Sequence, residues 1–172
     1  MNIRLLRHAT LVVDWGDVSI LVDPMLAEQE SLDPSPNAAN AHRIPMLPLP
    51  LNDSDLEQLI AGVDGVFVTH THRDHWDASA AELITHETPL VCQPADVDKF
   101  TADGYTNFIT IQEHERWHGI EVSRTGGQHG TGEIGARTAP DNFIDTNAPR
   151  AMPKTSATCQ RFLTFAATCL AT

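Results

Sequence analysis

Three histidines and one aspartate lie within THTHRDH, residues 69–75 of the chain. They follow GVFV, an apolar run typical of a buried strand. If the chain stays extended past Thr69, His70 and His72 project to the same side, and both imidazoles can reach one ion at about 2.0–2.1 Å. Two imidazoles are half of a tetrahedral ligand set. The segment therefore predicts a metal centre.

Asp74 and His75 lie just beyond, where we expect the chain to turn into a helix. A carboxylate and an imidazole at this point could hold a second ion about 3.5–4 Å from the first. Both ligand types suit Zn(II) and also accept Fe or Mn, so the spacing does not choose the metal. A closed structural zinc site usually recruits thiolates, which the segment lacks. An open, catalytic type of site with one or two ions is favoured.

A third ligand for the first ion must come from elsewhere in the chain. His129 in TGGQHGTGEIG is the leading candidate, because it follows a predicted strand and its flanking glycines let the backbone come close to a site. An ordinary loop histidine is the alternative interpretation of the same residue.

A second histidine pattern, HERWH at residues 114–118, matches the H-E-x-x-H signature of zinc proteases letter for letter. The two histidines of that signature reach one metal ion only from one face of a helix. Here the segments before and after the pattern are strand-like, and Gly119 follows at once. We therefore expect His114 and His118 in a turn between strands, and the protease interpretation is disfavoured.

The elements that must position these residues alternate between strands and helices. Strands are predicted at residues 3–6, 10–15, 18–24, 65–69, 89–93, 105–111 and 119–125. Helices are predicted at residues 53–62 and 78–86, with Asp53 and Asp77 as their N-caps, and at 94–104. This alternation is typical of a layered α/β or α+β domain.

Two connections stand out between these elements. Gly16 and Asp17 form a turn pair between two β-branched runs, so the strands on either side are expected to pair as an antiparallel hairpin. Residues 25–51 contain five prolines and little periodicity. They are predicted to form a long loop, a kind of segment that in compact domains is usually functional or disordered.

Composition narrows the function classes. The 172 residues carry a formal net charge of -12 and no run of Lys or Arg, so nucleic acid is an unfavourable partner. Three cysteines without Cys-x-x-Cys spacing indicate neither a disulfide framework nor a thiolate zinc site, and a reducing cytoplasm is the expected location. Charged residues interrupt the apolar runs near the N-terminus, so neither a signal peptide nor a membrane span is expected.

The composition changes near residue 135. Residues 1–135 hold 7 of the 11 bases and 21 of the 23 acids, whereas residues 136–172 hold 4 bases, 2 acids and no histidine. The second segment also lacks a sustained period of 2 or 3.6. Two explanations compete: a genuine flexible tail, or a chain that is truncated or frameshifted near Gly135.

The H-x-H-x-D-H pattern after an apolar strand resembles the metallo-β-lactamase superfamily. HATLVVDWGDVSILVDPML and GGQHGTGEIG make the chain similar to the branch that contains the ascorbate-6-phosphate lactonase. The resemblance covers residues 1 to about 135. It implies that the first ion is bound by His70, His72 and His129, and the second by Asp74 and His75. It also implies that Asp23, in LVDP, supports the metal-binding segment without binding metal itself.

Members of this superfamily continue into a second αβ half, which supplies a bridging aspartate and a final histidine for the second ion. Neither is recognisable after His129. Residues 1–135 are therefore expected to build only the N-terminal portion of the four-layer αββα sandwich, followed by an atypical tail at 136–172. This absence favours a truncated or frameshifted chain. Such a chain is expected to be marginally stable or to associate with itself, because part of its sheet would lack a covering layer.

The function implied by the resemblance is metal-dependent hydrolysis of a small ester, lactone or phosphoester. Zinc is the expected ion, and Asp74 would orient or deprotonate the attacking water. Two alternatives stay open: an inactive, metal-binding fragment of such a hydrolase, and an iron-containing oxidoreductase of the same superfamily. The partners expected are a small-molecule substrate and a second copy of the chain, and no membrane.

Overall fold

The computed structural model describes residues 1–35 and 40–125, together with two short strands at 143–145 and 161–162. The candidate ligand His129 and the predicted change near residue 135 lie outside the described residues. The tail and its two explanations therefore stay predictions.

A six-stranded sheet forms the centre of the fold, in the order β1-β2-β3-β4-β5-β6. Its strands are β1 (Asn2–Arg7), β2 (Thr10–Trp15), β3 (Val18–Val22), β4 (Gly65–Val68), β5 (Leu90–Cys92) and β6 (Phe108–Thr110). The predicted hairpin of β2 and β3 is confirmed, and β1 pairs antiparallel with β2. From β3 to β6 all pairings are parallel. The carboxyl ends of these four strands therefore share one edge of the sheet.

Three helices and a 3-10 turn connect the parallel strands: α1 (Asp53–Gly62), α2 (Ala78–Leu83), η1 (Pro94–Asp96) and α3 (Val97–Ala102). Asp77 caps α2 as predicted, by accepting from the Ala80 N–H. The prediction of Asp53 as the cap of α1 was wrong by one residue. Asn52 has the extended backbone of a cap, and its side chain accepts from the Asp55 N–H, which leaves Asp53 in the first turn.

Helix α2 ends earlier than predicted, at Leu83 instead of His86. The Tyr105 hydroxyl donates to the carbonyl of Ile84 at 2.9 Å and of Ala81 at 3.2 Å. These contacts satisfy carbonyl groups that a longer helix would have used itself. A tertiary contact therefore ends the helix where its local sequence would have continued it.

A second sheet contains β7 (His114–Trp117), β8 (Ile120–Thr125), β9 (Phe143–Asp145) and β10 (Arg161–Phe162), in the order β10-β8-β7 with β9 also paired to β8. The expectation that His114 lies in a turn was wrong, because β7 begins at this residue. The turn is shorter and consists of His118 and Gly119, which have φ values of 47° and 77°. The H-E-x-x-H pattern thus lies on a strand and a turn, not on the helix that a zinc protease requires.

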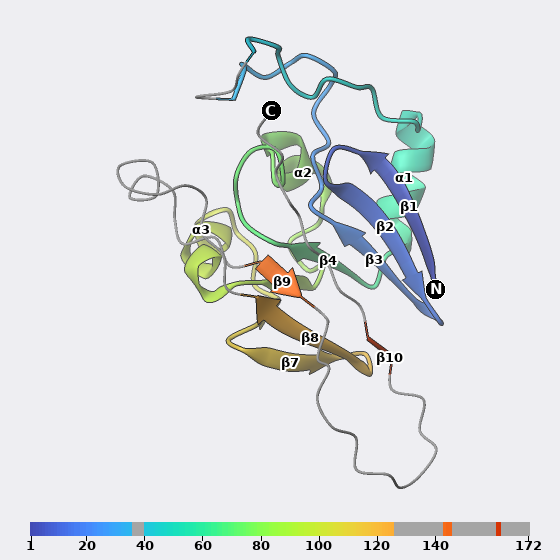
Figure 1. The fold of residues 1–172 in the computed structure, drawn as a ribbon, viewed down its shortest axis with the longest axis vertical. Helices are drawn as coiled ribbons and strands as arrows, with labels where there is room; N and C mark the ends of the chain where they lie inside the picture. Colours follow the sequence, from blue (N-terminus) through green and yellow to red (C-terminus); the bar gives the residue numbers. More distant parts are fainter. Residues whose placement is uncertain (36–39, 126–142, 146–160, 163–172) are drawn as a thin grey trace, which may run out of the picture.

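The first sheet is covered on both faces, and these contacts define three layers (Figure 1). Toward the helices, alternate strand residues pack against α1, α2 and α3: Val12, Leu21, Val66, Val68 and Leu90 against Leu56, Ile60, Ala80 and Phe100. Toward the second sheet, their neighbours pack against β7 and β8: Val13, Ile20, Val22, Phe67 and Val91 against Trp117, Ile120 and Val122. The predicted mixed α/β class is confirmed, and the described layers run helix, sheet, sheet.

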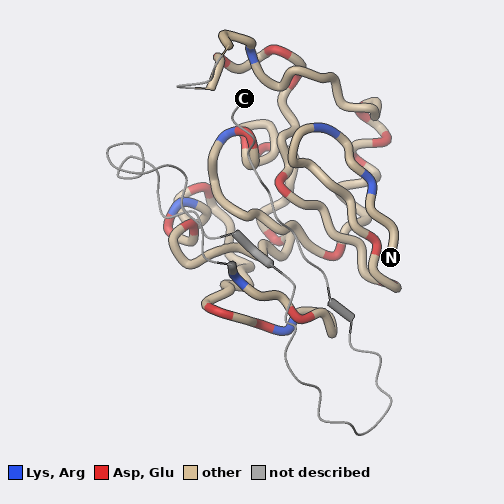
Figure 2. The backbone as a smooth tube through the Cα atoms, viewed as in Figure 1, with Lys and Arg blue, Asp and Glu red and all other residues tan. Residues whose placement is uncertain are grey.

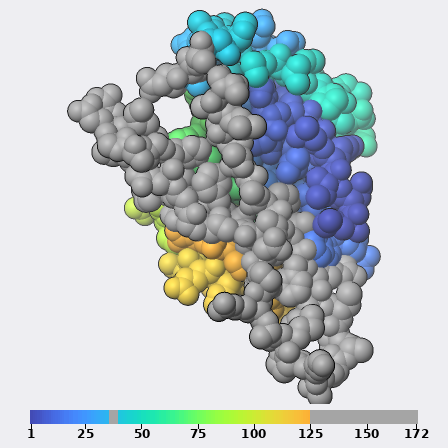
Figure 3. Space-filling view, in the orientation of Figure 1, coloured from blue at the N-terminus to red at the C-terminus, as the bar shows by residue number. Residues whose placement is uncertain are grey.

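The predicted long loop joins β3 to α1, and among its described residues one isolated bridge, between Leu32 and Ile44, is the only strand-like pairing. In the space-filling view it lies beside α1, at the opposite end of the molecule from β7 and β8 (Figure 3). Lys and Arg residues lie apart from one another along the described backbone (Figure 2). No helix in the described part of the chain combines the length and apolarity needed to cross a membrane.

Candidate metal centre

Residues 69–75, which we call the histidine segment, lie at the carboxyl edge of the parallel strands, directly after β4. Its turn is closed by the His72 carbonyl, which accepts from the N–H groups of His75 at 2.9 Å and Trp76 at 2.8 Å. Trp76 is 3% exposed, and its ring meets that of Phe100 edge-on, with 5.1 Å between centroids. The apolar core therefore anchors one end of the segment, and β4 anchors the other.

The structure brings together four of the residues that the sequence singled out. The ring centroid of His70 lies 4.5 Å from that of His72 and 4.0 Å from that of His75. The Asp74 carboxylate lies 3.6 Å from His75 Nε2 and is one-third exposed, whereas His70 and His75 are buried. The segment therefore gathers imidazoles in the interior and holds one carboxylate toward solvent.

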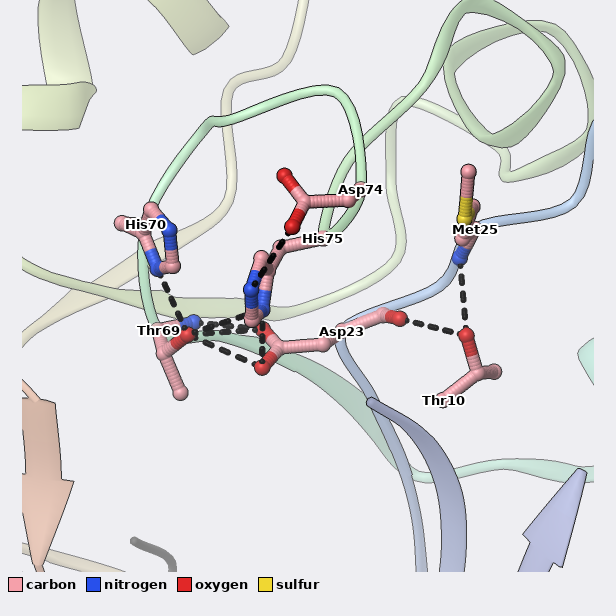
Figure 4. Close-up of polar contacts among 7 residues, drawn as sticks. All are labelled: Thr10, Asp23, Met25, Thr69, His70, Asp74 and His75. Atoms are coloured by element: carbon pink, nitrogen blue, oxygen red, sulfur yellow. Dashed lines mark hydrogen bonds and ion pairs between the residues drawn. The ribbon is translucent and has the colours of Figure 1, made fainter. Parts of the chain in front are cut away.

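Asp23 lies at the centre of the hydrogen bonds beneath these rings (Figure 4). Its carboxylate is 1% exposed and accepts from the Thr69 N–H at 2.8 Å, from the Thr69 hydroxyl at 2.9 Å and from His75 Nδ1 at 2.8 Å. Thr10 fixes the backbone directly after Asp23: its hydroxyl donates to the Asp23 carbonyl at 2.7 Å and accepts from the Met25 N–H at 3.0 Å. Asp23 has a φ of 44°, so this bridge stabilises a left-handed conformation.

This network favours one tautomer for each of the two buried imidazoles. A carboxylate only accepts hydrogen bonds, so the Thr69 hydroxyl gives its hydrogen to Asp23. The Thr69 oxygen then accepts from His70 Nδ1, 3.0 Å away, while His75 Nδ1 donates to Asp23 directly. In a neutral imidazole whose Nδ1 carries the hydrogen, Nε2 holds the lone pair. This is the form that metal-binding histidines take when a carboxylate or another acceptor fixes the ring.

The donor chemistry of the segment thus fits an ion of the zinc type. Within residues 1–35 and 40–124, however, no three His, Cys, Asp or Glu side chains are arranged as a complete metal-binding group. The further ligand expected from the sequence, His129, lies outside the described residues. The assignment of metal ligands in the described part of the chain therefore stays a prediction.

Buried charge holds the long loop beside the segment. Arg7 is 1% exposed, and its guanidinium donates to the carbonyls of Met25, Ala27 and Leu47. Burial lowers the pKa of Arg7, and the charge of Asp77 partly opposes that shift. Burial also raises the pKa of the Asp77 carboxyl, although it accepts from the Ala27 N–H at 2.8 Å. The two side chains together fix the start of the loop against α2.

Two further side chains, those of Arg73 and His8, hold the loop. Arg73, inside the histidine segment, donates to the carbonyls of Asp33 at 2.7 Å and Pro34 at 2.6 Å. His8 Nε2 accepts from the Met46 N–H at 2.9 Å. The described parts of the loop are thus held by side chains of β1, of the turn after β1 and of the segment itself.

Sequence reasoning missed two of the residues that organise the centre. Thr69 was assigned only to the end of a strand, and Thr10 only to the start of one. The position of Thr69 between a strand and a metal-binding motif is a weak signal, since a hydroxyl there can join neighbouring side chains. No signal marks Thr10, because its partner Asp23 is 13 residues away and the contact depends on how β2 and β3 pair.

The sequence model of the beta-lactamase superfamily domain matches residues 2–143 of this chain. The chain belongs to the beta-lactamase superfamily. Among relatives in this superfamily, UPF0173 protein YddR of Bacillus subtilis (strain 168) is 33% identical over 135 residues, which cover 77% of this chain and 52% of that protein. The predicted superfamily membership is confirmed, while the lactonase-like branch stays a prediction.

Two solved structures resemble this beta-lactamase superfamily chain. A possible metal-dependent hydrolase from Veillonella parvula is 31% identical, with a TM-score of 0.75, over 83% of this chain and 56% of that one. An isothiocyanate hydrolase from Delia radicum gut bacteria is 34% identical, with a TM-score of 0.70, over 79% of this chain and 52% of that one. The chain spans about half the length of these relatives. The likeness confirms the predicted fold of the described domain.

Proposed function

We propose that this chain is a metal-dependent hydrolase, with zinc as its ion, that cleaves a small ester, lactone or phosphoester. His70, His72 and His129 would hold the first ion, and Asp74 and His75 would serve the second. The observation that carries the proposal is the pair of contacts that His75 Nδ1 makes with Asp23 and His70 Nδ1 makes with Thr69. With Nδ1 as the donor in both contacts, Nε2 of each ring would be the ligand atom.

The residues of the chain have separate tasks in this reaction. A bound divalent ion would supply Lewis acidity, which lowers the pKa of a water molecule and polarises the group under attack. Asp74, one-third exposed beside His75, would orient the attacking water and accept its proton. Asp23 holds His75 in orientation from below. Arg73 holds the loop against the segment through the carbonyls of Asp33 and Pro34.

The relatives support the class of reaction. Both solved structures described above carry hydrolase names, and one is named an isothiocyanate hydrolase. The central carbon of an isothiocyanate is electrophilic, as is the carbonyl carbon of a lactone, so one type of site can direct water to either. An isothiocyanate therefore belongs among the candidate substrates.

The test uses the full chain, stripped of metal and then loaded with Zn(II), Mn(II) or Fe(II). Each form is assayed against a lactone, an aryl ester, a phosphodiester and an isothiocyanate. We expect turnover of at least one substrate, loss of that turnover with a chelator, and a decrease of about 10²- to 10⁴-fold in Asp74→Asn. Metal binding without turnover would favour the inactive fragment, and iron with redox activity would favour the oxidoreductase. A chain that binds no metal contradicts the proposal.

A further inference from the structure

The histidine segment is held from the residues that follow both neighbouring strands. Strand β4 lies between β3 and β5, so the residues after β3 and β5 flank the segment. Asp23 follows β3. Asp96 follows β5, and its Oδ1 accepts from the Thr71 hydroxyl at 2.9 Å. Thr71 is the residue between His70 and His72.

Asp96 is nearly as buried as Asp23, at 4% exposed. A buried carboxylate is costly unless hydrogen bonds compensate it. Here each oxygen has a donor: Oδ1 accepts from Thr71, and Oδ2 accepts from Nε2 of the fully buried Gln93 at 2.8 Å. The Gln93 amide thus fixes the orientation in which Asp96 meets Thr71.

Asp96 is the last residue of η1, and α3 continues directly from it at Val97. Its backbone is helical, with φ of -96° and ψ of -9°, and its side chain makes no hydrogen bond to the first turn of α3. The carboxylate is instead directed across 25 residues of sequence to Thr71.

A residue of α3 reaches the same point. Lys99, three residues after Asp96, donates from Nζ to the Thr71 carbonyl at 3.2 Å. The side chain of Thr71 is therefore held by η1 and its carbonyl by α3. In THTH, each threonine is bound to one buried aspartate, Thr69 to Asp23 and Thr71 to Asp96, and the two histidines alternate with them.

We propose that Asp96 is a positioning residue for His70 and His72: through Thr71 it fixes the peptide between the two imidazoles, opposite the support that Asp23 gives. The role of this position in metal binding rests on the proposed function. The contact of Asp96 with Thr71 involves only residues of the chain, so its effect on the two histidines can be tested without metal.

The first experiment therefore uses the full chain without metal. Ring nitrogen resonances of its histidines are measured by NMR in Thr71→Val, which removes the hydroxyl at nearly constant volume, and in Asp96→Asn. Thr71→Ser keeps the hydroxyl, and Asp98→Asn removes an exposed charge from α3. We expect the His70 and His72 resonances to shift in the first pair and to stay unchanged in the second pair. Unchanged resonances in Thr71→Val and Asp96→Asn overturn the proposal.

The second experiment measures Zn(II) affinity in the same four variants. Loss of a residue that orients metal ligands typically weakens binding about 10- to 100-fold, and we expect this in Thr71→Val and Asp96→Asn, with Thr71→Ser and Asp98→Asn close to the parent. Equal affinity in all variants overturns the role in metal binding. If the parent chain binds no zinc, the proposed function fails, while the metal-free resonances still decide whether Asp96 positions the histidines. If Asp96→Asn does not fold, Thr71→Val and Thr71→Ser decide both points.

Discussion

The Asp23 carboxylate accepts from His75 Nδ1 across 2.8 Å, and this contact joins the end of β3 to the histidine segment after β4. The same carboxylate accepts from the backbone and the hydroxyl of Thr69. One buried side chain thus fixes both the start and the end of the segment. Its contribution can be measured separately from that of the metal ligands.

Asp23→Asn should weaken zinc binding by about 10- to 100-fold, because an amide cannot accept from Thr69 and His75 with both of its polar atoms. Competition with a chromophoric chelator measures the affinity. Asp17→Asn removes one exposed negative charge from the turn between β2 and β3, and should leave the affinity unchanged. Equal affinities for the two variants would show that Asp23 does not support the site.

Thr10→Val should destabilise the chain by about 1–3 kcal/mol, because the buried Asp23 carbonyl and Met25 N–H both lose their hydroxyl partner. Thr10→Ser keeps the hydroxyl and should recover most of the loss. Urea unfolding of the three proteins gives the free energies. A valine variant as stable as the parent would mean that the bridge does not stabilise the left-handed backbone of Asp23.

Arg7→Met should lower the free energy of unfolding by about 3 kcal/mol, because the carbonyls of Met25, Ala27 and Leu47 would lose a charged donor in a buried place. Arg4→Met is the matched control, since Arg4 lies exposed on the same strand. Urea unfolding with both variants separates the buried network from the loss of one positive charge. Equal effects of the two substitutions would contradict the assigned role of Arg7.

Alkaline pH should destabilise the fold through Tyr105. Burial, and secondarily the charge of Asp103, raises the pKa of its phenol from 10.0 to about 12. Between these values the unfolded chain releases the proton and the folded chain retains it, so stability falls as the pH rises. Tyr105→Phe should show a shallower fall between pH 10 and 12, whatever its stability at neutral pH. Parallel pH profiles for the two proteins would contradict the raised pKa.

The Cys92 thiol should be inert in the native chain. It is fully buried, and burial raises its pKa to about 12, with the charge of Asp96 as a second cause. In a Cys159→Ser and Cys169→Ser background, a thiol reagent at pH 8 should label the chain only after unfolding. Rapid labelling of the folded protein would show that the carboxyl end of β5 opens to solvent.

Much of this fold follows from local patterns. The hairpin of β2 and β3 and the strand before the histidines were predicted because alternation, turn residues and apolar runs act within a few residues. The predictions that failed concern the bounds of single elements. Asn52 took the cap assigned to Asp53, and His114 joined a strand because β7 pairs with β8, a contact that no single segment encodes.

Some residues of the candidate site could be identified from the sequence, and others could not. His70, His72, Asp74 and His75 could be identified because their spacing is a motif. Thr10 and Asp96 could not, since each acts on a segment 13 or 25 residues away, and their partners become neighbours only when the sheet forms. The residues that hold a site in place are set by strand order, whereas the residues that do its chemistry are recognised by type and spacing.

The central claim is that the histidine segment binds metal, and elemental analysis of the purified chain after dialysis tests it most directly. The parent should retain at least one zinc ion per chain, and His72→Ala should lose the first ion. Where the parent holds two ions, Asp74→Ala should lose the second. His114→Ala, in the H-E-x-x-H pattern on β7, should retain the parent content. Unchanged metal in His72→Ala and Asp74→Ala would contradict the account, and loss in His114→Ala alone would move the site to the second sheet.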